Sequence, residues 1–429
     1  MYILKEFNVD DMWGEKDAKI YFNDDVNFLI GENSSGKTTI IYLLASLLNL
    51  DEDKIRKFDF NNCKLVLQQK NNPNKCIELK CVNGELFRII FTDENGVSKL
   101  VKNDRGLFLF DIDVWDKNKN DKRDFISQKV LKSKLSKVIN FTWLSIHRNT
   151  ENYQNIDTYY QPIDQRLSEI KSGLMKYFSS QAQKYDEEVI NFQKNIFLEF
   201  IDPTIDTNLT GIINGIDLDE TANDIRKIFD MLGLNDSDNK IEKLLEKYIN
   251  SINLLEPLED GPKFGVENYV DIYNLARVSA IIKKYNDLNK KKDEIYYLQN
   301  KFVETLNKFF GVTKKATINS QNELIFTKIQ NEFNKQKNRK TKTEFDINDL
   351  SSGEKQIVIL LAETLLQDKK VSVFIADEPE LSLHLKWQEL LTTSIRSLNP
   401  NAQILFATHS PDIVSIFDKK IIKMKDVLK

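Results

Sequence analysis

A strand, a glycine-rich loop and a helix follow one another directly near the N-terminus, and this order constrains the fold more than any other feature. Residues 26–30 are an apolar run typical of a buried strand. The loop that follows consists of Gly31, Glu32, Asn33, Ser34, Ser35, Gly36, Lys37, Thr38 and Thr39. Its spacing matches G-x-x-x-x-G-K-T, whose backbone N–H groups bind phosphate when the loop lies between a strand and a helix. The sequence therefore predicts a nucleotide-binding loop.

Each residue type in this loop has a chemical reason. Gly31 and Gly36 allow the tight turn and the close backbone approach that a Cβ would block. Lys37 is expected to reach the β- and γ-phosphates of ATP, and Thr38 is expected to offer its hydroxyl to Mg²⁺. The helix that follows adds its N-terminal dipole. Its predicted apolar face consists of Ile40, Ile41, Leu43, Leu44, Leu47 and Leu48.

A second apolar strand lies near the C-terminus, at residues 371–378, and ends in two carboxylates. Asp377 is placed to hold Mg²⁺, as the acidic residue at the end of such a strand does in phosphate-loop ATPases. Glu378 is expected to polarise the attacking water as a general base. Pro379 is expected to end the strand.

Another apolar run, residues 403–407, leads into Thr408 and His409. Ligands bind at the carboxyl ends of strands in open α/β sheets, so His409 is a candidate catalytic residue. The chain has only three histidines, and His384 also falls in this region whereas His147 does not. We therefore favour a functional role for His409 over a structural one.

The segment before residues 371–378 contains a helix start with two interpretations. Ser351 and Glu354 have the spacing of a capping box, which begins many helices without any ligand. A helix N-terminus that contains a glycine is also a site for the γ-phosphate. The candidate residues are Ser351, Ser352, Gly353 and Glu354, ahead of an apolar helix at residues 357–362.

The order of these motifs carries a family resemblance. The phosphate loop, L-S-S-G-E, A-D-E-P-E, L-S-L-H and A-T-H-S-P together resemble the nucleotide-binding domain of ABC-type ATPases. More narrowly, they are similar to the OLD-like and SMC-like ATPases of prokaryotic phage defence, including Septu-type and retron-associated ones. The resemblance implies an α/β fold: an ABC-type P-loop ATPase head of two lobes, with a mixed sheet, flanking helices and an inserted helical domain.

The resemblance also implies a head-to-tail homodimer in which each ATP lies between two copies. Lys37, Glu378 and His409 would then act in catalysis, with His409 sensing the γ-phosphate. Ser351 and Gly353 would reach the ATP of the other copy. Two positions depart from the transporter pattern, because Ser352 replaces the first signature glycine and His384 replaces an aspartate. Arg148, after a strand at residues 141–146, is either a site residue or a solvated surface arginine.

The resemblance and the periodicity divide the chain into three predicted parts. An N-terminal ATPase lobe is expected at residues 1–160, a helical insertion at 161–310 and a C-terminal ATPase lobe at 311–429. Short alternating runs between residues 60 and 115 predict antiparallel hairpins. Trp13 precedes a predicted strand and could stack on adenine, although a core or surface aromatic is the simpler interpretation.

The middle of the chain shows two heptad-like seams. These seams predict either a short coiled arm or the core of a helical bundle, and an arm of ~30 residues would span only ~45 Å. The seam residues are Phe178, Ala182, Tyr185, Val189, Phe192 and Ile196, and then Ile281, Tyr285, Leu288, Ile295, Phe302, Leu306 and Phe309.

Composition excludes several classes of protein. The net charge is −4, so the whole chain is no polycation and any nucleic-acid contact must be local, for example at residues 337–342. Cys63, Cys76 and Cys81 form no metal-type pair, which suits a reducing cytoplasm. No long apolar run or leader pattern is present, so we expect a cytoplasmic protein with no membrane span.

The expected function is ATP hydrolysis within a prokaryotic antiviral complex. Only twenty residues follow His409, too few for the nuclease domain that some OLD-like relatives carry. The effector is therefore expected to be a separate protein such as a nuclease. A RecF-like or SMC-like ATPase that clamps DNA during repair is the alternative, and a nucleotide sensor with little turnover is a third.

Overall fold

The computed structural model describes most of the chain, which divides into two compact units. The first unit comprises Met1–Lys176 and Gln299–Lys429, and the second comprises Tyr177–Leu298. His147, Arg148 and the lysine-rich residues 337–342 lie outside the described residues. The described residues are 1–84, 87–94, 96–102, 127–145, 162–201, 218–231, 242–243, 246–247, 249–250, 266–311, 313–328, 344–414 and 416–429.

A parallel sheet pairs a strand from the N-terminal part of the chain with strands from the C-terminal part. Its strand order is β14-β3-β13-β12-β8, and every described neighbour pair is parallel. Strands in such sheets are near-continuous apolar runs because helices cover both faces, which explains the composition of these segments. Their bounds are β3 Val26–Ile30, β8 Phe141–Ser145, β12 Ser372–Asp377, β13 Ala402–Thr408 and β14 Ile421–Lys423.

An antiparallel sheet forms the rest of the N-terminal lobe. Its order is β2-β1-β4-β5-β6-β7, which confirms the predicted hairpins. Cys63 and Cys81 lie directly opposite each other on β4 and β5 and are free thiols, so they are buried strand residues. The strands are β1 Tyr2–Met12, β2 Lys16–Tyr21, β4 Asn62–Gln69, β5 Asn72–Val82, β6 Phe87–Asp93 and β7 Gly96–Lys102.

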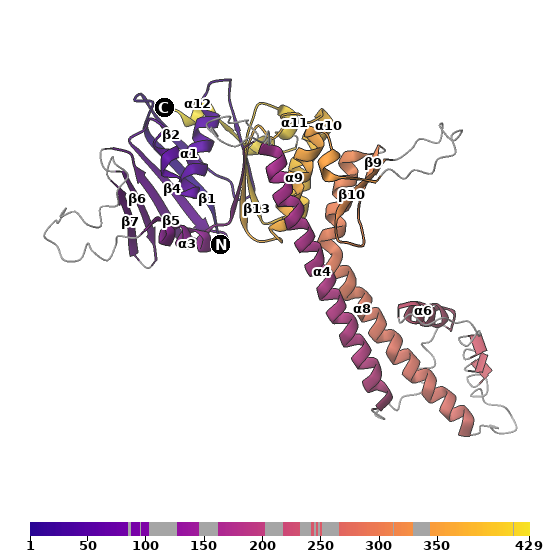
Figure 1. Ribbon diagram of the computed structural model, residues 1–429. Coiled ribbons are helices and arrows are strands. Elements are labelled where there is room, and N and C mark those ends of the chain that lie inside the picture. The colour runs from indigo at the N-terminus through magenta and orange to yellow at the C-terminus, as the bar shows by residue number, and fades with distance from the viewer. Residues whose placement is uncertain are drawn as a thin grey trace, which may run out of the picture. The chain divides into compact units, whose positions relative to one another are not determined.

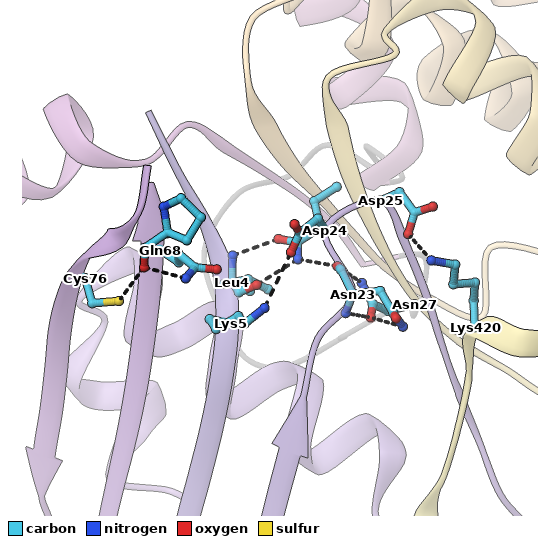
Figure 2. A network of polar contacts seen from close by, with 11 residues as sticks. Leu4, Lys5, Asn23, Asp24, Asp25, Asn27, Gln68, Cys76 and Lys420 are labelled. Carbon is cyan, nitrogen blue, oxygen red and sulfur yellow. Dashed lines mark hydrogen bonds and ion pairs between the residues drawn. The ribbon is translucent and has the colours of Figure 1, made fainter. Parts of the chain in front are cut away.

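A buried amide joins the two sheets. Gln403 of β13 accepts a hydrogen bond from Leu4 N at 2.7 Å and donates to Leu4 O at 2.8 Å and to Asn23 O at 2.7 Å. Asn27, also fully buried, donates to Asn23 O. Figure 2 labels Leu4, Asn23 and Asn27 of this network, together with the ion pair between Asp25 and Lys420. Buried polar groups that are paired in this way fix one arrangement of the sheets.

Helices cover the parallel sheet and complete the first unit. The predicted apolar face of α1 is buried in one core with residues of β12 and β13, as expected from its pattern. The helix expected after the capping box is α9, and a small sheet of order β11-β10-β9 precedes it in the chain. The bounds are α1 Lys37–Asn49, α2 Glu52–Ile55, α3 Gln128–Val138, β9 Lys314–Ile318, β10 Leu324–Lys328, β11 Glu344–Asp346, α9 Ser352–Leu366, α10 Leu385–Leu398, α11 Pro411–Val414 and α12 Met424–Val427.

The helical unit is built on two long helices that lie side by side (Figure 1). These are α4 Pro162–Ile201, with 40 residues, and α8 Val266–Phe310, with 45 residues. The helices themselves are longer than the expected ~30 residues, although both also extend into the first unit. Phe192 and Tyr285 from the two predicted seams meet with ring centroids 6.1 Å apart. Phe192, Tyr285 and Leu288 form a buried apolar cluster, and Ile228 of a shorter helix, α6 Leu218–Met231, packs into it. The unit therefore consists of two paired long helices with a third helix against them.

No helix among the described residues is both long enough and apolar enough to cross a bilayer.

Candidate functional site

The glycine-rich loop follows β3 and opens α1, as the sequence predicts. Lys37 is only 4% exposed, and its Nζ donates hydrogen bonds to Gly31 O at 2.9 Å and Glu32 O at 3.0 Å. Burial lowers the pKa of Lys37, against the opposing effect of Glu378, Asp377 and other carboxylates nearby. The Lys37 ammonium is therefore held inside its own loop, close to the acidic residues of β12.

The outer residues of the loop are open to solvent. Glu32, Asn33, Ser34 and Thr38 are exposed, whereas Ser35, Gly36 and Thr39 are half-buried. Exposed backbone and hydroxyl donors at a helix N-terminus form a suitable surface for an anion.

Two glycines of the loop are required by close contacts. A Cβ on Gly31 would lie 2.6 Å from Ser35 Oγ and 2.8 Å from Met424 Cβ. Gly36 has φ of +90°, and a Cβ there would lie 2.4 Å from the indole ring of Trp13. The ring of Trp13 thus lies against the loop while 41% of the residue stays exposed. The sequence favoured a core or surface aromatic, and the structure adds that this partly exposed ring contacts the glycine-rich loop.

Asp377 lies at the end of β12, beside the loop. It is fully buried, and its Oδ1 is 3.4 Å from Thr38 Oγ1, although the two residues are 339 positions apart in the chain. The register of the parallel strands creates this proximity, because β3, β13 and β12 end at the same edge of the sheet. A threonine hydroxyl beside one carboxylate is the donor set that Mg²⁺ uses together with phosphate oxygens and water.

A buried hydroxyl supports the same fit. Ser35 Oγ is inaccessible to solvent and has no hydrogen-bond partner among the described residues. Buried polar atoms are normally satisfied, so an unpaired donor within a phosphate-type loop is suited to a phosphate oxygen. The residues present therefore fit a magnesium–nucleotide complex.

Glu378 follows Asp377 in a left-handed backbone conformation. Its φ is +47°, which is unusual for a residue with a side chain, and its N–H donates to Ala407 O at 2.8 Å. The strand thus ends at Asp377, one residue earlier than predicted, and the turn begins before Pro379. Glu378 Oε1 lies 3.6 Å from His409 Nε2. Non-glycine residues in this conformation cluster at functional sites, where neighbouring contacts hold them.

A third carboxylate, which the sequence analysis did not single out, supports the loop that carries His409. Glu380 Oε1 accepts hydrogen bonds from Thr408 Oγ1 at 2.5 Å, His409 N at 2.9 Å and Ser410 N at 3.2 Å. The sequence shows an acidic residue directly after Pro379, but the local pattern does not indicate which groups it binds.

The N-terminus of α9 is capped as predicted. Glu354 accepts hydrogen bonds from Ser351 N and Ser351 Oγ, both at 2.8 Å, and from Lys314 Nζ at 2.7 Å. Burial raises the pKa of Glu354, but the bonds from Lys314 and Ser351 outweigh it, so its pKa is lowered. The carboxylate therefore stays charged at the helix start, while Ser351 and Ser352 remain exposed.

Gly353 has a role within the same chain. A Cβ at this position would lie 2.4 Å from Ser382 O, so only glycine allows α9 to approach the loop after β12. Gln356 of the same helix donates to Pro379 O at 2.7 Å. The structure thus ties the start of α9 to the segment after Glu378.

His384 has a local structural role. It is exposed and is the N-cap of α10, where its Nδ1 accepts a hydrogen bond from Lys386 N at 3.4 Å. An N-cap acceptor satisfies a free backbone N–H of the first helical turn. This accounts for the histidine without a ligand.

The chain matches the family described as AAA ATPase domain over residues 8–414. The chain belongs to this family. Since the family is an ATPase family, the protein is an ATPase, and its structure combines the α/β unit that carries the glycine-rich loop with a second, helical unit.

Among curated proteins, the chain is 24% identical over 438 residues to "Retron Vc95 probable ATPase" of Vibrio cholerae serotype O1 biovar El Tor. The alignment covers 96% of this chain and 71% of that protein.

Among solved structures, the Smc head domain with an extended coiled coil from Pyrococcus furiosus aligns with 13% identity and a TM-score of 0.45, covering 100% of this chain and 96% of that one. The SMC head domain from Thermotoga maritima aligns with 11% identity and a TM-score of 0.36, covering 96% and 90%.

Proposed function

We propose that the site hydrolyses ATP with Lys37, Thr38, Asp377, Glu378 and His409 acting on one nucleotide. The observation that carries the proposal is the 3.4 Å separation of Thr38 Oγ1 and Asp377 Oδ1, which joins the glycine-rich loop to the acidic strand end. The contact between Glu378 and His409 at 3.6 Å places a carboxylate and an imidazole beside them.

In this mechanism each side chain has one task. Lys37 leaves the carbonyls of Gly31 and Glu32 and binds the β- and γ-phosphates. Thr38 and Asp377 hold Mg²⁺, which when bound neutralises charge on the phosphate oxygens. Glu378 accepts a proton from the attacking water. His409, held beside Glu378, donates a hydrogen bond to the γ-phosphate.

We propose further that two copies enclose the nucleotide head to tail, with Ser351 and Ser352 of one copy facing the phosphate loop of the other. Both serines are exposed at the start of a 15-residue helix, whose N-terminus attracts anions. Leu381 and Leu385 are also exposed, at 38% and 60%, on the segment that α9 contacts, so apolar surface is available beside the serines.

Light scattering on the Glu378→Gln variant tests the dimer. With ATP and Mg²⁺ we expect a mass of twice 50.1 kDa, because bound ATP persists when the general base is lost. Adding Ser351→Arg should leave ATP binding intact and keep the protein monomeric. A Glu378→Gln protein that binds ATP and stays monomeric contradicts the enclosed arrangement.

We propose that the biological setting is antiviral defence with a separate effector such as a nuclease. The support is the similarity to a retron ATPase across 96% of this chain, together with the motif order shared with phage-defence ATPases. Co-purification with the products of neighbouring genes tests this setting. Phage restriction by the ATPase alone, as a single species, contradicts a separate effector.

The competing DNA-clamp function has a distinct result. ATP turnover that rises with DNA, and loses this response when Lys337, Arg339 and Lys340 are reversed in charge, favours repair over defence. Turnover that ignores DNA but responds to a phage component or a partner protein supports the defence function.

A further inference from the structure

A single carboxylate oxygen accepts three hydrogen bonds from the loop after β13. Glu380 Oε1 receives the Thr408 hydroxyl and the backbone N–H groups of His409 and Ser410, at 2.5, 2.9 and 3.2 Å. Successive backbone N–H groups at the end of a strand form a concave site for an anion. Here an internal carboxylate occupies that site, and hydrogen bonds to a charged acceptor are about twice as strong as neutral ones.

His409 is consequently held from two directions. Glu380 binds its backbone N–H at 2.9 Å, and Glu378 lies 3.6 Å from its imidazole Nε2. The two glutamates flank Pro379, and the left-handed conformation of Glu378 is part of the turn between them. Glu380 thereby fixes the backbone from which the imidazole extends, and Glu378 faces the ring.

A second residue supports the same loop. Gln388 of α10 accepts a hydrogen bond from Ser410 Oγ at 2.6 Å and donates to Leu383 O at 2.9 Å. The two contacts join the loop to the segment that follows Glu380. The other oxygen of Glu380, Oε2, is buried and has no hydrogen-bond partner among the described residues, so the bonds of Glu380 to the loop all run through Oε1.

We propose that Glu380 is a positioning residue for ATP hydrolysis, which acts by fixing the Thr408–His409–Ser410 backbone so that His409 meets the reacting phosphate. This inference rests on the proposed role of His409. It also gives the two glutamates different roles. Glu380 Oε1 accepts hydrogen bonds from three donors of the loop, whereas Glu378 is the proposed general base.

Steady-state kinetics test the role. Glu380→Ala should lower kcat by about 10- to 100-fold and change KM for ATP by less than about threefold, because His409 acts mainly in the transition state. Glu380→Gln should recover kcat to within about fivefold, since its amide oxygen can accept the same three bonds. The exposed Glu389→Ala on α10 is the matched control and should match the wild type.

A double substitution asks whether Glu380 acts through His409. In a His409→Ala background, Glu380→Ala should lower kcat by less than about twofold more, because residues that act as one unit are not additive. A further loss as large as in the wild type overturns the proposal. So does a kcat for Glu380→Ala within twofold of the wild type.

Amide hydrogen exchange without nucleotide tests the geometry independently of the ATP site. Glu380→Ala should raise exchange at His409 by about tenfold or more, while Leu405 within β13 stays unchanged. The rise at Ser410 should be smaller, because its N–H also donates to Thr408 Oγ1 at 2.9 Å. This measurement tests the contacts of Glu380 even if the wild-type protein fails to hydrolyse ATP. Unchanged exchange at both amides overturns the proposed hold on the loop.

Discussion

The proposed nucleotide site and the helical unit are held together by different kinds of contact. At the site, charged groups are buried, with Lys37 at 4% and Asp377 at 0% exposure, and segments from both ends of the chain meet there. In the helical unit, an apolar cluster joins α4, α6 and α8, and the ion pair of Lys291 with Glu188 is partly exposed. Buried charges are retained at a cost in stability, whereas an apolar seam supplies stability. Substitutions should therefore cost activity at the site and stability in the helical unit.

The largest effect is expected at Glu378. Glu378→Gln removes the proposed general base without changing side-chain size, so kcat should fall by about 10³-fold, equal to about 4 kcal/mol of barrier. The affinity for ATP and the melting temperature should change little. Phosphate-release kinetics, equilibrium binding and calorimetry check these values. If Glu378→Gln lowered the melting temperature and left kcat unchanged, the proposed difference between the site and the helical unit would be wrong.

The helical unit should respond in the opposite way to Phe192→Ala. This ring is 4% exposed within the cluster, so its loss should destabilise the unit by about 3 kcal/mol. Phe197 lies on the same helix at 66% exposure, and Phe197→Ala should change stability by less than about 0.5 kcal/mol. Denaturant unfolding, monitored by amide hydrogen exchange in α4, measures the stability of both variants. Equal effects of the two substitutions would show that the cluster does not hold the unit together.

Gly353→Ala tests close packing beside the site. Its Cβ would lie 2.4 Å from a backbone oxygen that has little freedom to move, and such overpacking costs about 2 kcal/mol. Gly84→Ala is the matched control, because nothing lies within 4 Å of its Cβ. Urea unfolding compares the two proteins. If Gly353→Ala keeps full stability but prevents ATP-dependent dimerisation, the proposed contact across copies matters more than the one with Ser382.

The smallest effect is expected for Lys314→Met, and it should depend on pH. Lys314 and Ser351 hold the folded pKa of Glu354 below its ordinary 4.5, so the ionised pair stabilises the fold above that value. Removing Lys314 should cost about 1.5 kcal/mol at pH 7, and the difference should shrink as the pH falls through the lowered pKa.

The exposed pair of Lys308 with Glu304 is the control, and Lys308→Met should have no measurable effect at any pH. Urea unfolding at several pH values gives both curves. A destabilisation by Lys314→Met that is constant with pH would indicate lost packing instead of a lost ion pair.

Sequence patterns predicted the parts of this protein that local rules govern. The loop at Gly31–Thr39, the apolar face of α1 and the capping box of Ser351 with Glu354 each depend on spacing within one element. Alternating runs likewise predicted the hairpins of β4 to β7. The order of motifs then indicated the family that the comparisons show.

Contacts set by register and turns could not be read from the sequence. Glu380 meets Thr408 28 positions away only because β12 and β13 pair in parallel and Glu378 turns the chain. Trp13 reaches Gly36 from a turn in which its own φ is +62°. The sequence indicates Gly353 as a residue of the signature motif. The structure shows that a side chain at this position would also clash with the backbone of Ser382.

The central claim is that distant segments act on one nucleotide, and a double substitution of Lys37 and Asp377 tests it most directly. We expect Lys37→Met and Asp377→Asn each to lower kcat/KM for ATP by at least about 10²-fold. The double variant should fall no more than a few-fold below the worse single one, as for residues that act together. Losses that multiply, or an Asp377→Asn protein that turns over ATP at the wild-type rate, would contradict the account.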